Sequence, residues 1–122
     1  MSSDKKILFV DDDLDFLEAT QLMLMDEGYD VVPATNGEQA VEKYKEIKPD
    51  IVFLDIKMPG IDGYETFFRI NKFDADARVI FTSSYTFDKE KFKRAKNLSL
   101  KGILNKPLEF DDLEMAIKKY AK

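Results

Sequence analysis

The sequence predicts an α/β protein with a doubly wound fold, in which one five-stranded parallel sheet carries helices on both faces. Short apolar runs alternate with segments of helical spacing along the whole chain, as in successive right-handed βαβ units. The runs at residues 7–10 and 51–54 are apolar at every position, which is typical of strands buried on both faces. Together these two patterns predict a (βα)₅ arrangement.

Five apolar runs are the expected strands, and an expected helix follows each of them. The strands should be residues 7–10, 31–34, 51–54, 79–81 and 102–104. The first helix should end at Gly28, and the second should stop before Pro49. The buried face of the first helix should carry residues that recur at helical spacing, namely Phe16, Ala19, Thr20, Met23 and Leu24.

The last three helices are placed by the residues at which they start. The third should follow Gly63, and the fifth should begin at Asp111 or Asp112. The fourth should cover residues 87–97, where most side chains are charged. Because few apolar residues can anchor this helix, we expect it to be mobile.

Length and composition limit the possible functions. The 122 residues suit one domain, so we expect a single domain over residues 1–122 with no output domain. The net charge of -5 argues against direct binding of nucleic acid, which needs a basic surface. Because Cys and His are absent, thiolate and imidazole chemistry are excluded. No apolar stretch approaches the roughly 18 residues of a membrane span, and a signal peptide is lacking, so we expect a cytoplasmic protein without membrane contact.

Three acidic residues and one lysine lie at predicted strand ends. Asp11 and Asp12 follow the first strand, Asp55 follows the third, and Lys106 comes shortly after the fifth. Because the carboxyl ends of parallel strands share one edge of the sheet, these four side chains should meet in one pocket. Clustered carboxylates repel one another unless a cation or protons neutralise them. The sequence therefore predicts a hard divalent metal ion at this edge and a chemical step at a carboxylate.

Each residue of this cluster also has a simpler explanation. An aspartate after a strand is often only the N-cap of the next helix, and this explanation applies to Asp11 and Asp12 as well. Asp13 and Asp15 are assigned this structural role, as cap and first-turn acids that the helix dipole favours. A lone lysine is usually solvated. The occurrence of all four residues at strand ends favours a site over these local explanations.

Four stretches of the sequence resemble one protein family. Residues 7–13, 51–63, 79–84 and 105–107 resemble the receiver domain of two-component response regulators, in the family's order and spacing. The resemblance covers essentially the whole chain and is to single-domain regulators of the chemotaxis kind. It implies a flavodoxin-like receiver fold and a phosphoprotein that acts in signal transduction, within a two-component system or phosphorelay.

The resemblance implies a role for each residue of the cluster. Asp55 would be the phosphoacceptor, which takes a phosphoryl group from a phosphohistidine and becomes an aspartyl phosphate. Mg²⁺ would be the cofactor, with Asp12 and Asp55 as side-chain ligands and Asp11 as a direct or water-mediated ligand. The carbonyl of Lys57 would add a backbone ligand to the metal. Lys106 would pair with Asp55 at rest and with a phosphate oxygen afterwards.

The switch positions of the family are less regular in this chain. The family has Ser or Thr at the end of the fourth strand, and alignment of the apolar residues puts Ser83 there, with Thr82 as the alternative in a register shifted by one. Many receivers have Tyr or Phe three residues before the lysine, where this chain has Ile103. A branched aliphatic side chain cannot give the same ring movement. Tyr85 is a nearby aromatic residue that could replace it or only flank the site.

The first helix has more apolar residues than one buried face needs. Leu14, Leu17 and Met25 lie near one line at helical spacing. They are either scattered exposed residues or, with Pro107 and Leu108, a docking face beside the site. The resemblance implies that a histidine kinase or a histidine phosphotransfer protein docks there. It also implies a downstream protein target on the fourth helix, fifth strand and fifth helix, and we expect the chain to be a monomer.

The leading hypothesis is a response regulator that switches protein–protein interactions or relays phosphate. We do not expect an enzyme, although such a regulator catalyses its own phosphotransfer and dephosphorylation. Residues 11–15 also resemble haloacid-dehalogenase-like phosphatases, whose nucleophile would be Asp11 or Asp13. A third hypothesis is a pseudo-receiver that binds partners without phosphate. The intact acid pair, Asp55 and Lys106 argue against it, and the departure at Ile103 keeps it open. A nucleotide-binding Rossmann domain lacks support, because no Gly-rich loop follows the first strand.

Overall fold

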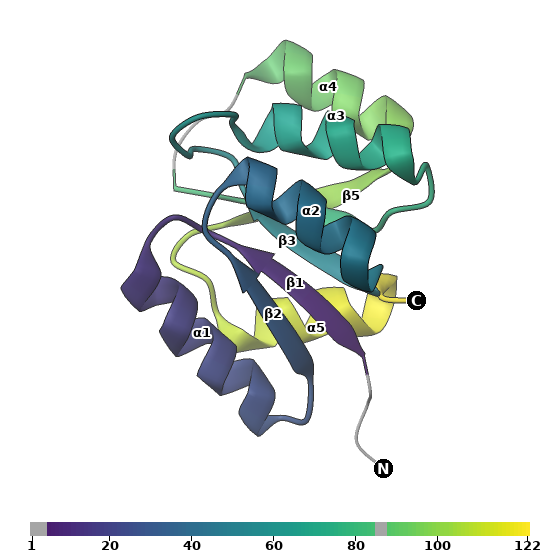
Figure 1. Cartoon of the computed structure of the whole chain (residues 1–122). Coiled ribbons are helices and arrows are strands. Elements are labelled where there is room, and N and C mark those ends of the chain that lie inside the picture. The colour runs from purple at the N-terminus through teal and green to yellow at the C-terminus, as the bar shows by residue number, and fades with distance from the viewer. Residues whose placement is uncertain (1–4, 85–87) are drawn as a thin grey trace.

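The computed structural model describes residues 5–84 and 88–122, and within them strands and helices alternate strictly (Figure 1). All strand pairs are parallel, in the order β2-β1-β3-β4-β5, so the predicted doubly wound α/β fold is confirmed. The strands are β1 (Lys6–Val10), β2 (Asp30–Ala34), β3 (Ile51–Asp55), β4 (Val79–Ser83) and β5 (Leu100–Asn105). The helices are α1 (Leu14–Asp26), α2 (Gly37–Ile47), α3 (Gly63–Phe73), α4 (Lys89–Leu98) and α5 (Phe110–Tyr120). None of these helices is long and apolar enough to cross a membrane.

The sheet separates two apolar cores. Helices α2, α3 and α4 cover one face of the sheet, and α1 and α5 cover the other (Figure 1). Along β3, Leu54 lies in the first core with Phe67 of α3, whereas Phe53 lies in the second core with Leu24 of α1. Every residue of β3 is buried. Burial on both faces explains why this run is apolar until it reaches Asp55.

The order of the strands brings two acidic residues together. β1 lies between β2 and β3, so the chain leaves β1 toward one edge of the sheet and later continues on the other side. Crossovers in opposite directions open a crevice at the carboxyl ends of two such neighbouring strands. Val10 pairs with Leu54, so the next residues, Asp11 and Asp55, lie at the same level in the sheet.

The buried face of α1 differs from the predicted one. Leu17, Thr20 and Leu24 are buried, whereas Ala19 is exposed and Met23 is 37% exposed. The prediction is therefore wrong for Ala19 and Met23. Apolar side chains occur on every side of α1, so helical spacing alone cannot choose which side meets the sheet.

The helix starts agree with the prediction at α1 and differ at α5. Asp13 is the N-cap of α1 and accepts a hydrogen bond from the backbone N–H of Phe16 (3.1 Å), as predicted. The prediction for α5 is wrong, because the helix already begins at Phe110 and no side chain caps it. Asp111 and Asp112 lie in its first turn, where the helix dipole favours acidic residues without a capping hydrogen bond.

The start of α3 lies directly against the end of β3. The backbone N–H of Gly63 donates a hydrogen bond to the carbonyl of Ile56 (2.7 Å). A Cβ atom at Gly63 would lie 2.5 Å from the carbonyl oxygen of Asp55 and 2.6 Å from the Cα of Ile56. Both neighbours are backbone atoms, which cannot rotate away from an added methyl group. Glycine at position 63 therefore allows α3 to begin here and helps to hold Asp55 in place.

We expect Gly63→Ala to lower the free energy of unfolding by about 1–3 kcal/mol, because the added methyl group pushes α3 away from β3. Urea unfolding followed by circular dichroism measures this change. Gly102→Ala is the matched control, since no atom lies within 4 Å of a Cβ at that position. Equal losses of stability in the two variants would contradict the prediction.

Candidate functional site

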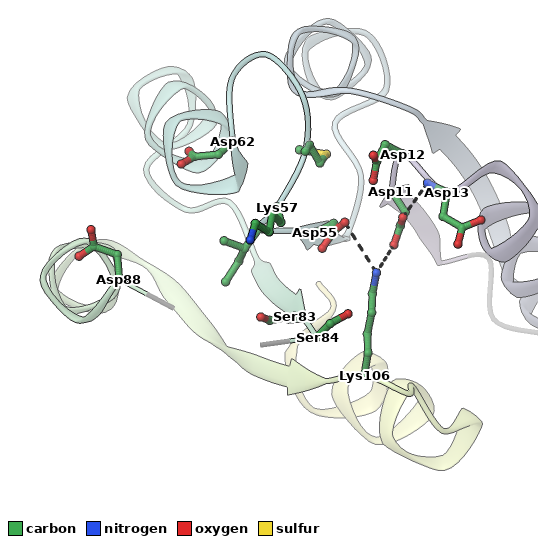
Figure 2. A pocket seen from close by; sticks show the side chains of 12 residues that line it. Asp11, Asp12, Asp13, Asp55, Lys57, Asp62, Ser83, Ser84, Asp88 and Lys106 are labelled. Carbon is green, nitrogen blue, oxygen red and sulfur yellow. Dashed lines mark hydrogen bonds and ion pairs between the residues drawn. The ribbon is translucent and has the colours of Figure 1, made fainter. Parts of the chain in front are cut away.

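A pocket of about 460 Å³ lies at the carboxyl ends of the strands (Figure 2). The ends of β1, β3 and β4 and the segment after β5 all contribute to it. It brings together residues that the sequence analysis placed at one edge of the sheet. These residues are Asp11, Asp12, Asp55, Lys57, Ser83 and Lys106.

Three N-cap residues line the pocket as well. Asp13, Asp62 and Asp88 cap α1, α3 and α4, and each accepts a hydrogen bond from the backbone N–H three residues later. The sequence analysis gave Asp13 only this structural role and did not single out Asp62 or Asp88. Their signal in the sequence is an acidic cap at the start of a helix that follows a strand. In this fold such helix starts lie at the same edge as the strand carboxyl ends, so acidic caps add negative charge to the pocket.

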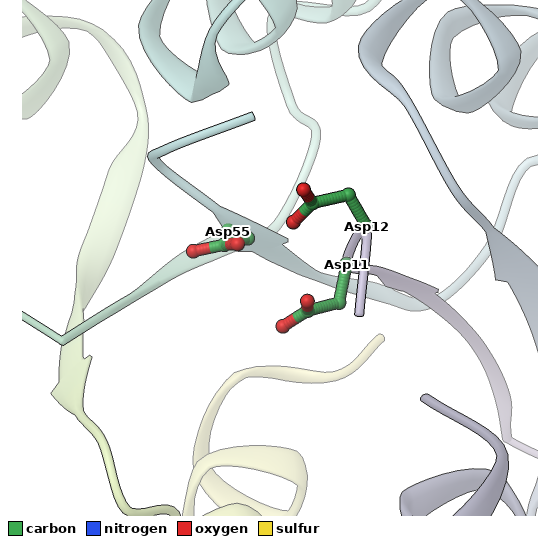
Figure 3. Close-up of side chains that lie close together, drawn as sticks. All are labelled: Asp11, Asp12 and Asp55. Carbon is green, nitrogen blue, oxygen red and sulfur yellow. The ribbon is translucent and has the colours of Figure 1, made fainter. Parts of the chain in front are cut away.

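Three carboxylates come close together in this pocket (Figure 3). One oxygen from each of Asp11, Asp12 and Asp55 lies within 4.8 Å of the others. Asp11 is fully buried and Asp55 is 5% exposed, whereas Asp12 is exposed to solvent. Mg²⁺ prefers hard oxygen ligands and usually keeps several of its waters. A cluster of carboxylate oxygens that is open on the side of Asp12 fits both requirements.

Lys106 supplies positive charge to the carboxylate cluster. Its Nζ lies 2.7 Å from Oδ2 of Asp11 and 3.7 Å from Oδ2 of Asp55, as the dashed lines in Figure 2 show. The expected ion pair between Lys106 and Asp55 is present, and Asp11 is an additional and closer partner of Lys106. The physical reason is burial, because the fully buried carboxylate of Asp11 would be strongly destabilised without a nearby cation. The peptide bond between Lys106 and Pro107 is cis.

The surroundings of Asp55 disfavour its ionised form. Burial and the charge of Asp11 raise the pKa of Asp55 to about 6, although the charge of Lys106 acts in the opposite direction. Burial lowers the pKa of Lys106, but the hydrogen bond to Asp11 and the charge of Asp55 outweigh it, so this pKa is raised. At neutral pH the pocket thus holds one ammonium group and more negative charge than that group can neutralise.

Ser83 is the hydroxyl residue that lines the pocket. It ends β4 and is 6% exposed, and Figure 2 shows it among the side chains that line the pocket. Thr82 pairs with Asp55 in the sheet register but is fully buried and does not line the pocket. The Oγ1 atom of Thr82 has no hydrogen-bond partner among the described residues. This placement favours Ser83 over Thr82 as the residue that can reach a group attached to Asp55.

Of the two remaining switch positions, 103 and 85, only Ile103 lies within the described residues. Ile103 of β5 is half-buried and packs against the core that α4 covers. Its side chain has no ring that could turn inward. Tyr85 lies outside the described residues, so its role stays a prediction.

The predicted docking face is only partly exposed. Leu14 is 64% exposed and Met25 is 50% exposed. The prediction for Leu17 is wrong, because its side chain is 4% exposed and packs in the core between α1 and the sheet. Pro107 is exposed, and Leu108 packs partly against the same core. Leu14 and Pro107 each directly follow a pocket residue in the chain, so exposed apolar groups lie next to the pocket.

Comparison with known proteins identifies the family to which this chain belongs. The family model for the response regulator receiver domain matches residues 7–118. The chain belongs to the response regulator receiver family. Its receiver domain is of the CheY type and is therefore a signalling domain and not a classical enzyme.

Several relatives resemble the chain over most of its length. It is 38% identical to the chemotaxis protein CheY of Halobacterium salinarum, covering 86% of this chain and 87% of that protein. It is 34% identical to the sporulation initiation phosphotransferase F of Bacillus subtilis, covering 95% of this chain and 93% of that protein. The fold is also similar to the crystal structure of the response regulator TrrA from Thermotoga maritima in complex with Mg²⁺ and BeF, with a TM-score of 0.82. The two sequences are 34% identical, and the match covers 95% of this chain and 98% of that one. The acidic cluster of this receiver thus fits a metal site of the kind seen in that structure.

In the absence of Mg²⁺, we expect Asp55→Asn to raise the free energy of unfolding at pH 7 by about 3 kcal/mol, because the pKa of Asp55 rises from 3.8 to about 6 on folding. Between these pKa values the folded receiver binds more protons than the unfolded chain. The stability of the wild type should therefore fall as the pH rises through this window, and that of the variant should not. Urea unfolding at a series of pH values measures both effects.

Asp13→Asn is the control for this experiment, because asparagine keeps the N-cap acceptor and the residue does not belong to the carboxylate cluster. It should show the same pH dependence as the wild type. A variant at position 55 that is no more stable than the wild type at pH 7, or that keeps the wild-type slope, would contradict the raised pKa.

Proposed function

We propose that this receiver is a phosphorylation-dependent switch, in which Asp55 accepts a phosphoryl group from a phosphohistidine on a histidine kinase or a histidine phosphotransfer protein. One observation carries the proposal. The carboxylate of Asp55 lies in an open pocket, next to the ammonium group of Lys106 (3.7 Å) and within 4.8 Å of oxygens from Asp11 and Asp12. This is an acceptor carboxylate beside the charges that phosphoryl transfer requires.

The chemistry follows from the residues in the pocket. An oxygen of Asp55 attacks the phosphorus atom, an O–P bond forms, and the P–N bond breaks as the imidazole leaves with the electron pair. The ammonium group of Lys106 pairs with a phosphoryl oxygen, and the hydroxyl of Ser83 donates a hydrogen bond to another. Asp11, Asp12, Asp55 and the carbonyl of Lys57 would hold Mg²⁺, which supplies positive charge that offsets the repulsion between two anionic reactants.

Phosphorylation would change the partners of two side chains. Lys106, now closest to Asp11, would gain a dianionic group on Asp55 as a stronger partner. Ser83 would move toward that group. Because α4 follows Ser83 in the chain, a downstream protein would read the change on α4, β5 and α5. A slow hydrolysis of the aspartyl phosphate at the same site would return the receiver to rest.

We expect acetyl phosphate with Mg²⁺ to add the mass of one phosphoryl group to the wild type and none to Asp55→Asn, as measured by intact-mass spectrometry. Asp13→Asn is the matched control and should be modified like the wild type, because Asp13 caps α1 and would not accept phosphate. Modification that persists in Asp55→Asn and disappears in Asp13→Asn would instead support a phosphatase-like nucleophile in the first loop.

The kinase or phosphotransfer protein would dock on the apolar surface beside the pocket. Leu14 and Met25 on α1, with Pro107 and Leu108 after β5, offer exposed or half-exposed apolar groups to a helical partner. Leu17 is not part of this surface because it is buried. Docking here would place the donor histidine over Asp55, since Leu14 and Pro107 adjoin pocket residues in the chain.

Leu14→Glu should slow phosphoryl transfer from a phosphorylated kinase by about tenfold, because a charge replaces an apolar contact at the centre of the interface. Phosphorylation by acetyl phosphate should keep its wild-type rate, since a small donor needs no docking surface. Leu98→Glu is the control, because Leu98 is 54% exposed but lies at the far end of α4. Equal loss with both donors, or an equal loss in the control, would rule out the docking role of Leu14.

A further inference from the structure

Helix α4 is anchored by very little apolar burial. Ala95 is its buried side chain, and Phe92 is half-buried. By comparison, the buried residues of α3 include Tyr64, Phe67 and Ile70. Apolar burial therefore contributes little to holding α4, and its position depends on other contacts.

Those other contacts are mostly polar and cation–π contacts to α3, which lies beside α4 (Figure 1). The guanidinium group of Arg94 lies 4.5 Å from the ring centroid of Phe68. The Nζ of Lys91 lies 5.9 Å from the ring centroid of Tyr64 and 4.0 Å from Oδ2 of Asp62. These contacts join the first two turns of α4 to the N-cap and the first two turns of α3.

Tyr64 contacts both the start of α4 and a strand that ends at the pocket. Its hydroxyl donates a hydrogen bond to the carbonyl of Asp88 (3.3 Å), the N-cap residue from which α4 starts. Its ring packs edge-on against Phe81 of β4, with centroids 5.2 Å apart. Phe81 precedes Ser83 by two residues in the same strand, so the two share a face of the sheet. Tyr64 therefore contacts both the strand that ends at Ser83 and the residue at which α4 begins.

We propose that Tyr64 is a positioning residue that couples the phosphorylation site to α4, in place of the ring that Ile103 cannot provide. This inference rests on the proposed function. At rest, the hydroxyl of Tyr64 holds the carbonyl of Asp88. When Ser83 moves toward the phosphoryl group, the carbonyl of Asp88, five residues later in the chain, is displaced. The hydrogen bond then breaks, and α4 is released from α3.

The burial of Tyr64 makes this hydrogen bond suited to stabilising the resting state. The side chain is 3% exposed, so its hydroxyl has little access to water as an alternative partner. A bond that is made at rest and lost on activation stabilises only the resting state, and so shifts the equilibrium between the two states. Its removal should favour the activated state by the net value of one hydrogen bond.

The test is Tyr64→Phe, which removes the hydroxyl and keeps the ring against Phe81. We expect this variant to bind beryllofluoride with Mg²⁺ about two- to tenfold more tightly than the wild type, as measured by titration calorimetry. Amide hydrogen exchange in α4, measured by mass spectrometry without ligand, should also be faster. Lys91→Gln, which changes an exposed side chain, should shift both quantities in the same direction.

Tyr44→Phe is the matched control. The hydroxyl of Tyr44 donates a 2.7 Å hydrogen bond to Asp74, so its loss also removes a bond of a buried tyrosine, but one between α2 and the end of α3. This variant should lose stability and keep the wild-type affinity for beryllofluoride. A general loss of stability is thereby separated from coupling to the site.

The possible outcomes are distinct. The role of Tyr64 would be overturned if Tyr64→Phe bound beryllofluoride no more tightly than the wild type. It would also be overturned if amide hydrogen exchange in α4 of this variant kept the wild-type rate. An equal gain of affinity in Tyr44→Phe would overturn it as well. If the wild type bound no beryllofluoride and accepted no phosphate on Asp55, the proposed function itself would fail, whatever Tyr64 does.

Discussion

The burial of two carboxylates side by side is the constraint on which this receiver depends. Asp11 and Asp55 are almost inaccessible to water, yet the ammonium group of Lys106 is their common cation. Carboxylates so placed repel each other, and the raised pKa of Asp55 reports that repulsion together with its burial. The pocket is therefore short of positive charge, and a divalent cation or a rearranged ion pair relieves it. This imbalance of charge supports the proposed metal binding and the proposed phosphoryl chemistry at Asp55.

The sheet keeps the charged groups together despite their repulsion. β1 and β3 are neighbours buried on both faces, and their register places Asp11 and Asp55 at the same level. Gly63 lets the first turn of α3 lie directly against the backbone of Asp55, which limits any movement of that strand end. The energy of the two apolar cores thus holds a polar arrangement that would not form by itself.

The opposite side of the pocket is built differently. α4 follows Ser83 in the chain and has a single buried side chain, so contacts of Tyr64, Phe68 and Asp62 with its polar groups hold it against α3. Such contacts are individually weak and can be exchanged without disturbing the core. The receiver thus combines a half that is packed around Asp55 with a half that has little apolar burial. That division suits a switch, because the chemistry needs fixed geometry and the output needs movement.

The sequence by itself determined the alternation of strands and helices, the acids at the strand ends, Lys106 and the family. These features are periodic or lie at fixed positions along the chain, so they are visible without coordinates. Only the tertiary structure decided that Leu17 faces the core, that Lys106 is closer to Asp11 than to Asp55, and that Tyr64 reaches the start of α4. Apolar residues occur on every side of α1, so their spacing does not identify the face that packs on the sheet. The other two contacts join separate elements, and their distances depend on how those elements pack rather than on any local pattern.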